Sequence, residues 1–248
     1  MHDLSAMAWG GAILSAMLIG ISKTGLPGVG ILAIIWMAAV IPARASTGLI
    51  LPLLIAGDVL AVAWYRRHAV WAHLFKLLPC AAAGVLIGYA ALAHVNDRQL
   101  RPIIGSVILA MLALNYWRNR LNGEEGRVPR GWPFAIVMGL SAGITTMMAN
   151  AAGPIMILYL LAMRLPKAEF IGTGAWYFLL VNLFKVPFSA NLGLITPASL
   201  RFNLVLIPAV LAGGLLGGWL AKRIPEKAFN AVVQLLAVLG AVKLILPN

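Results

Sequence analysis

The sequence is poor in charged residues and in cysteine, and both shortages narrow the class of protein. Only 10% of the 248 residues are charged, and 62% are hydrophobic. A soluble domain carries about 25% charged residues, so an ordinary soluble domain is excluded. The single cysteine, Cys80, lies in an apolar run and can form no disulfide within the chain. Because hydrophobic runs of membrane length recur along the sequence, we expect an integral membrane protein.

Acidic residues are also scarce. Seven Asp and Glu stand against nineteen Lys and Arg, which gives a formal net charge of +12. Most of the basic residues lie in short loops between apolar segments, so they report membrane topology and do not indicate a nucleic-acid-binding face. The four histidines show no convincing metal-ligand spacing, and no catalytic motif is complete. We therefore expect no nucleic-acid partner, no metal, no cofactor and no enzyme activity.

The hydropathy of the sequence predicts an all-α fold, with Pro, Gly and charged residues marking the ends of the apolar segments. The expected segments of the first half are 4–21, 29–41, 48–65, 73–92 and 99–117. Those of the second half are 132–148, 154–163, 171–189, 202–221 and 228–246. This division gives an N-terminal transmembrane repeat at 1–117, a cytoplasmic linker at 118–131 and a C-terminal transmembrane repeat at 132–248.

The two halves are related by more than hydropathy. Ile41-Pro42 followed by Gly48 matches Leu165-Pro166 followed by Gly172, and the same offset of 124 places Asp58 over Asn182. The stretches 77–88 and 206–217 also match, and their paired glycines indicate close helix contacts. Several such matches in the same order predict an internal duplication.

Each half carries one interruption of its apolar runs. The first is Ser22-Lys23-Thr24-Gly25-Leu26-Pro27-Gly28-Val29-Gly30, and the second is Asn150-Ala151-Ala152-Gly153-Pro154. Relative to Ala, a helix interior loses about 1 kcal/mol for Gly and about 3 kcal/mol for Pro. Irregular backbone at membrane depth persists only where protein buries it or where it lines a wet cavity. Paired interruptions of this kind are typical of the central binding site of a transporter.

The basic residues favour one orientation of the halves. If each interrupted segment is a single long span, the halves are parallel and the sixteen basic residues outside the segments divide eight to eight. If each is a re-entrant hairpin, the division is eleven to five, which satisfies the positive-inside rule. We therefore expect two inverted repeats, each a re-entrant hairpin followed by three transmembrane helices. Fully spanning segments remain the alternative.

The interruptions suit an anion. A helix that begins in mid-membrane presents free N–H groups and the positive end of its dipole, and Lys23 adds a cation. A site that offers hydrogen-bond donors and a cation but few carboxylates is suited to binding a small oxyanion. The candidate substrate-binding residues are Ser22, Lys23, Thr24, Gly25, Gly28, Gly30, Thr145, Thr146, Asn150 and Gly153.

Several of these residues also have a structural interpretation. Lys23 could extend to a membrane surface, and Asn150 could cap the helix that follows it. Thr145 and Thr146 could bond within their own helix.

Asp58 is the one carboxylate well inside an apolar run. A buried acid in a membrane needs a partner, a water-filled cavity or a proton. It is either a proton-coupling acid or a paired residue that ties helices together. Lys185, three residues after Asn182, could pair with Asp58 or contribute to the anion site. Asp58, Asn182 and Lys185 are therefore the candidates for coupling or gating.

These motifs together resemble one known family. They are Gly20-x4-Gly25-x2-Gly28-x-Gly30, Pro42…Thr47-Gly48, Gly57-Asp58 and Gly139…Gly143…Asn150-Ala-Ala-Gly153-Pro154. Over nearly the whole chain they resemble the sulfite exporter TauE/SafE family, in a variant subgroup with Ser22-Lys23-Thr24 where many members carry more glycine. The resemblance implies a permease of the bacterial inner membrane that moves sulfite, organosulfonates or related small anions.

The expected function is secondary transport of a small anion, which the resemblance makes a sulfur-containing one, by alternating access around a midplane site. An anion channel on the same scaffold is the alternative. The expected partners are the anionic substrate and the lipid bilayer, with protons as a candidate coupling ion. A monomer and a homodimer both remain open.

Overall fold

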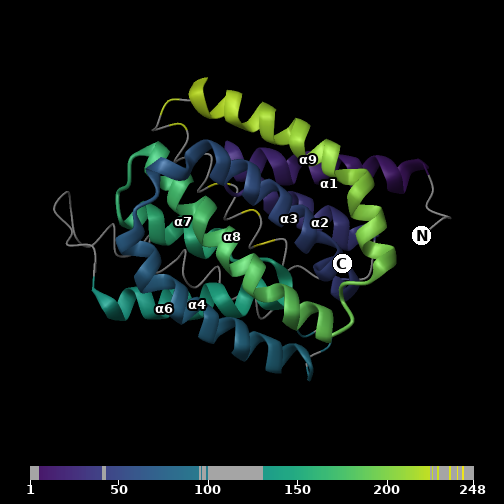
Figure 1. The fold of residues 1–248 in the computed structure, drawn as a ribbon, viewed down its shortest axis with the longest axis horizontal. Helices are drawn as coiled ribbons and strands as arrows, with labels where there is room; N and C mark the ends of the chain where they lie inside the picture. The colour runs from purple at the N-terminus through teal and green to yellow at the C-terminus, as the bar shows by residue number, and fades with distance from the viewer. Residues whose placement is uncertain are drawn as a thin grey trace.

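The computed structural model describes residues 6–40, 43–94 and 131–223, together with isolated positions at 96, 99, 225, 228, 235, 239 and 242. Within these residues the ordered elements are all helices (Figure 1), which confirms the predicted all-α fold. They are α1 (Ala6–Thr24), α2 (Val29–Val40), α3 (Ala43–Tyr65), η1 (Arg66–His68), α4 (Trp71–Leu92), α6 (Trp132–Ala149), α7 (Gly153–Ala162), α8 (Lys167–Asn191) and α9 (Pro197–Arg223).

The helices agree with the predicted apolar segments wherever the chain is described. The expected segments 99–117 and 228–246, and the linker 118–131 apart from Gly131, lie outside the described residues. Within the described residues, five helices are long and apolar enough to cross a membrane, namely Ser46–His68, Trp71–Leu92, Trp132–Ala149, Lys167–Asn191 and Pro197–Arg223. Large apolar side chains such as Phe75 and Leu204 are 68% and 66% exposed, as expected for surfaces that face lipid.

Both predicted interruptions separate a long helix from a short one. The chain reverses after α1, since α2 packs back against α1 and Gly28 has φ 102°. A Cβ on Gly30 would lie 2.8 Å from Ser22 Oγ, so any larger residue there would displace the Ser22 side chain. α2 has 12 residues and α7 has 10, so each is roughly 15–18 Å long, about half of a hydrocarbon core. These lengths support the re-entrant interpretation.

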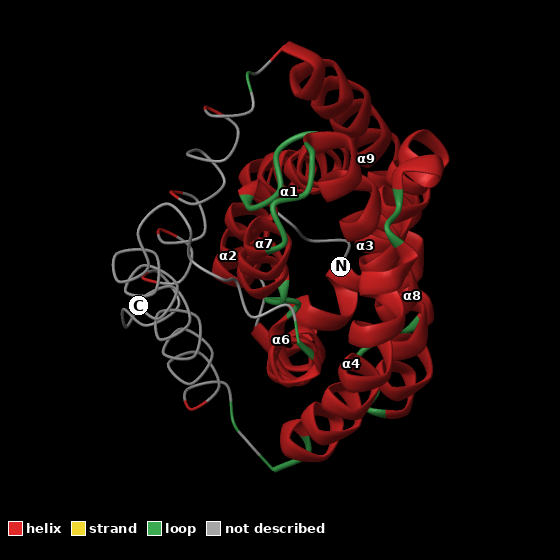
Figure 2. Ribbon diagram, turned by 90° about the vertical axis from the view of Figure 1, so that its left-hand side faces the viewer, coloured by secondary structure: helices red, strands yellow, loops and turns green. Residues whose placement is uncertain are grey.

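The half-length helices α2 and α7 come from opposite ends of the molecule. In Figure 1 they lie apart along the long horizontal axis, whereas Figure 2, which looks along that axis, places them next to one another. The two views together put α2 and α7 nearly end to end.

Two pairs of long helices pack closely, α1 with α9 and α4 with α6. Glycines make these contacts. A Cβ on Gly213 would overlap the carbonyl oxygen of Met17, and one on Gly88 would lie 2.9 Å from that of Ile144. The prediction that the paired glycines mark close helix contacts is confirmed.

α3 and α8 cross the middle of the molecule in opposite directions. Their contacts join Asp58 to Asn182 near the centre and Val70, just beyond α3, to Thr173 near the start of α8. Asp58 and Asn182 hold matching positions in the two predicted repeats. Inverted repeats require their matching helices to be antiparallel, as α3 and α8 are. The repeat relationship itself and the division at 118–131 stay predictions.

Candidate functional site

A cavity lies between the two interruptions. The polar and glycine residues that line it come from the two interruptions, α6 and α8, and are Ser22, Lys23, Gly28, Gly30, Thr146, Asn150, Gly153 and Asn182. The space open to the centre of a water molecule is about 70 Å³, and one water needs about 10–15 Å³ by this measure. The cavity therefore has room for several waters or a small ion.

Three of the predicted binding residues do not line the cavity. Thr24 Oγ1 donates to Gly214 O at 2.6 Å, and a Cβ on Gly25 would overlap the backbone of Gly217, so both face α9. Thr145 Oγ1 donates to Ser141 O at 2.8 Å, within α6. Thr24 and Gly25 thus pack α1 against α9, and Thr145 bonds within its own helix, whereas the other seven predicted binding residues surround the cavity.

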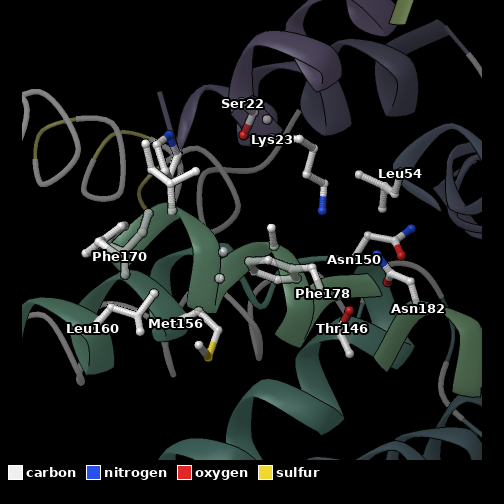
Figure 3. A pocket seen from close by; sticks show the side chains of 18 of the residues that line it. Ser22, Lys23, Leu54, Thr146, Asn150, Met156, Leu160, Phe170, Phe178 and Asn182 are labelled. Carbon is white, nitrogen blue, oxygen red and sulfur yellow. The ribbon is translucent and has the colours of Figure 1, made fainter. Parts of the chain in front are cut away.

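Lys23 points into the cavity and does not extend to a membrane surface. Its Nζ lies 2.7 Å from Asp58 Oδ1, and its side chain is 10% exposed. The same Nζ stands 4.3 Å from the centroid of the Phe178 ring, in cation–π geometry. Figure 3 shows the amine between Phe178 and the amides of Asn150 and Asn182. Lys23 is therefore both the partner of the buried acid and a cation that a bound molecule can reach.

Asp58 is joined to the second lysine through Asn182. Asn182 Nδ2 donates to Asp58 Oδ2 at 2.7 Å, and Asn182 Oδ1 accepts from Lys185 Nζ at 3.3 Å. Asp58 is fully buried, and Lys185 is 1% exposed. Lys185 thus contacts the amide of Asn182, and no direct ion pair between Lys185 and Asp58 is present in the described part of the chain.

Lys185 also holds the second interruption in place. Its Nζ donates to Asn150 Oδ1 at 2.6 Å and to Thr146 Oγ1 at 3.0 Å. Asn150 Nδ2 in turn donates to Thr47 O at 2.9 Å, which ties the turn after α6 to α3. Two ammonium groups and one carboxylate give this network a formal charge of +1 among the described residues. This positive charge would attract an anion into the cavity.

The N-terminus of α7 is left open to the cavity. Its N-cap is Ala152, with no side-chain hydrogen bond to the cap, and Pro154 in the first turn has no N–H to satisfy. The interpretation of Asn150 as the cap of α7 is wrong. Asn150 has φ 55° and ends α6. Its side chain accepts a hydrogen bond from Lys185 and donates one to the carbonyl oxygen of Thr47. Backbone N–H groups at the start of α7 are thus available to an anion.

Sequence reasoning missed the apolar wall of the cavity. One face of α8 contributes Ile171, Gly174, Ala175 and Phe178, in line with the polar Asn182. Their spacing of three or four residues follows the helical period. That period is a usable signal, but apolar residues also occupy the other faces of α8, so the sequence does not indicate which face lines the cavity.

Comparison with known proteins identifies the family to which the chain belongs. The model of the sulfite exporter TauE/SafE family matches residues 12–244. The chain belongs to this family. A TauE/SafE-like relative, the probable inner membrane transporter protein TsaS of Comamonas testosteroni, is 26% identical over 200 residues, which are 79% of this chain and 81% of the relative. No solved structure matches the chain.

Family membership confirms the resemblance that the sequence motifs indicated. Together with five helices able to cross a bilayer, it makes this chain a multi-pass membrane transporter of the TauE/SafE family. The expected localisation in the bacterial inner membrane agrees with the printed name of the relative.

Proposed function

We propose that this TauE/SafE protein is a secondary transporter, and not an enzyme, that moves a small sulfur-containing anion such as sulfite or an organosulfonate. The observation that carries the proposal is the ammonium group of Lys23 in a cavity bounded by both helix interruptions. The formal charge of +1 on the network and the free N–H groups of α7 support an anion over a cation or a neutral solute.

The walls of the cavity favour an organic anion within this class. In Figure 3, Thr146, Asn150 and Asn182 gather on one side together with Leu54, while Met156, Leu160 and Phe170 lie on the opposite side. The apolar lining is Pro27, Ile34, Leu54, Met156, Ile157, Leu160, Phe170, Ile171, Ala175 and Phe178. A bare oxyanion would contact only the polar side, whereas an organosulfonate would place its sulfonate there and its carbon body against the apolar wall.

Alternating access fits the arrangement of the helices. The half-length helices α2 and α7 approach from opposite ends, and both border the cavity. Rocking of one predicted repeat against the other, about the crossing of α3 and α8, would open the cavity to each side in turn.

Transport by the purified full-length protein in proteoliposomes tests the proposal. We expect saturable uptake of methanesulfonate or benzenesulfonate, with sulfite as a competitor. Ohmic currents would instead support the anion channel, and no flux above protein-free liposomes would contradict both.

Two neighbouring threonines provide a matched control for this assay. Thr146→Val removes an oxygen that holds Lys185 beside the cavity, and Thr145→Val removes only a hydroxyl bonded within α6. We expect reduced uptake for Thr146→Val and near-normal uptake for Thr145→Val. Equal uptake by the two variants would count against the assigned site.

A further inference from the structure

The two lysines of the network, Lys23 and Lys185, differ in how many of their N–H donors are bonded to oxygen. An ammonium group has three N–H donors. Those of Lys185 meet three neutral oxygens, on Thr146, Asn150 and Asn182, at 3.0, 2.6 and 3.3 Å. Lys185 is 1% exposed and does not line the cavity. Lys185 therefore has no N–H donor left for a transported molecule.

In the described part of the chain, the ammonium group of Lys23 has N–H donors that are not bonded to an oxygen. Among the described residues its one oxygen partner is Asp58 Oδ1 at 2.7 Å, and its remaining contact is the ring of Phe178. Lys23 lines the cavity, but Asp58 does not and is fully buried. An anion in the cavity can thus reach the ammonium of Lys23 without reaching the carboxylate that holds it.

We infer that Lys23 exchanges its carboxylate partner Asp58 for the transported anion, and that Asp58 takes up one proton when this happens. This inference rests on the proposed function. An anion beside Lys23 competes with Asp58 for the same ammonium and also repels the carboxylate. A buried carboxylate that loses its only paired cation costs several kcal/mol. Protonation removes that cost, and the amide of Asn182 can still bond the neutral acid.

The other charged groups around Asp58 do not replace Lys23. The helices packed against α3 are α1, α2, α6, α8, α9 and the short η1. Of these, α2 and α6 carry no titratable side chain. Near the ends of α8 and α9 and in η1 lie Lys167, Glu169, Arg201, Lys222, Arg223, Arg66, Arg67 and His68. Tyr177 is internal to α8 and lies five positions before Asn182. Among the described residues, Lys185 reaches Asp58 only through Asn182.

The exchange keeps the charge of the site constant. In the empty state Lys23 is positive and Asp58 is negative. In the loaded state Lys23 is positive, the anion is negative and Asp58 is neutral. For a monovalent sulfonate the movement of anion plus proton is therefore electroneutral, and the loaded site meets no added electrostatic barrier in the bilayer.

Calorimetry on the purified full-length protein counts the protons. Methanesulfonate and benzenesulfonate stay fully ionised at every pH used, so any proton taken up binds to the protein. Titrations at one pH in buffers of different ionisation enthalpy should give about one proton per anion. The affinity should then fall about tenfold per pH unit over the range in which free Asp58 is ionised.

Two variants and an infrared measurement test whether Asp58 is the group that takes up the proton. Asp58→Asn should bind the anion with no proton uptake, and Glu169→Gln, which removes a carboxylate from the first turn of α8, should behave as wild type. In the wild-type protein and in Glu169→Gln, but not in Asp58→Asn, infrared difference spectra should show a carboxylic-acid carbonyl band that appears with the anion. If only sulfite binds, the infrared measurement is made with sulfite.

Anion binding without proton uptake and without this band would overturn the exchange while leaving the transporter proposal intact. Proton uptake that persists in Asp58→Asn would also overturn it. If neither sulfonate nor sulfite binds, the proposed function fails together with this inference.

Discussion

Gly153, at the start of α7, offers a substitution that changes the cavity and little else. A Cβ built there would meet no atom within 4 Å, and the residue lines the cavity. The backbone of Gly153 is helical with no positive φ. Gly→Ala at a compatible position stabilises a protein by about 0.4–1 kcal/mol, so Gly153→Ala should fold at least as well as wild type.

The same methyl group should weaken anion binding. It would occupy space beside the free N–H groups of α7, where we place the anion. A hydrogen bond to a charged group contributes about 1.5–3 kcal/mol. Loss of one such bond corresponds to roughly a tenfold to hundredfold higher Kd.

Gly143, on the neighbouring helix α6, is expected to show the opposite behaviour when substituted, with lower stability and unchanged anion affinity. A Cβ there would overlap the carbonyl oxygen of Ala81 and lie 2.9 Å from the Cα of Gly84. Both neighbours are backbone atoms, so α4 and α6 would have to separate. Overpacking of this kind costs about 1–3 kcal/mol. Gly143→Ala should therefore lower stability, but the protein that remains folded should keep its affinity, because Gly143 is not a lining residue.

Thermal unfolding in detergent, with and without benzenesulfonate, measures both effects. A ligand at 100 times its Kd stabilises the wild-type protein by about 2.7 kcal/mol, and calorimetry gives Kd directly. Wild-type affinity in Gly153→Ala would remove the N-terminus of α7 from the anion site. Wild-type stability in Gly143→Ala would refute the packing argument for α4 and α6.

The remaining predictions concern the buried ion pair and the topology. Lys23→Ala should destabilise the fold by about 3–5 kcal/mol, because it leaves the carboxylate of Asp58 without its cation. Lys23→Ala combined with Asp58→Asn should recover much of that stability in thermal unfolding but not anion binding, and a double variant that binds normally would remove Lys23 from the site. Asp58→Asn alone should flatten the pH dependence of uptake in proteoliposomes, and an unchanged profile would return Asp58 to a structural role. Reporter fusions at Glu124 and at the C-terminus should report opposite sides of the membrane, and same-side signals would contradict the inverted repeats.

The sequence was sufficient to predict the helices and the place where they break. Hydropathy and the positions of glycine and proline are local properties, so α7 begins at Gly153 beside the predicted start at 154, and α1 ends within the first interruption. The same local signals brought Lys23, Asn150 and Gly153 into the list of candidates, since polar residues and glycine at membrane depth require a special environment.

The tertiary structure decided which of those candidates face the cavity and which partner each one has. Thr145 and Thr146 are equivalent in composition, but successive residues on a helix point about 100° apart, so one bonds within α6 and the other accepts from Lys185. The pairing of Lys23 with Asp58, and the place of Asn150 between Lys185 and Thr47, depend on how distant helices approach one another. Local sequence carries no measure of those distances, because they are set by the packing of whole helices.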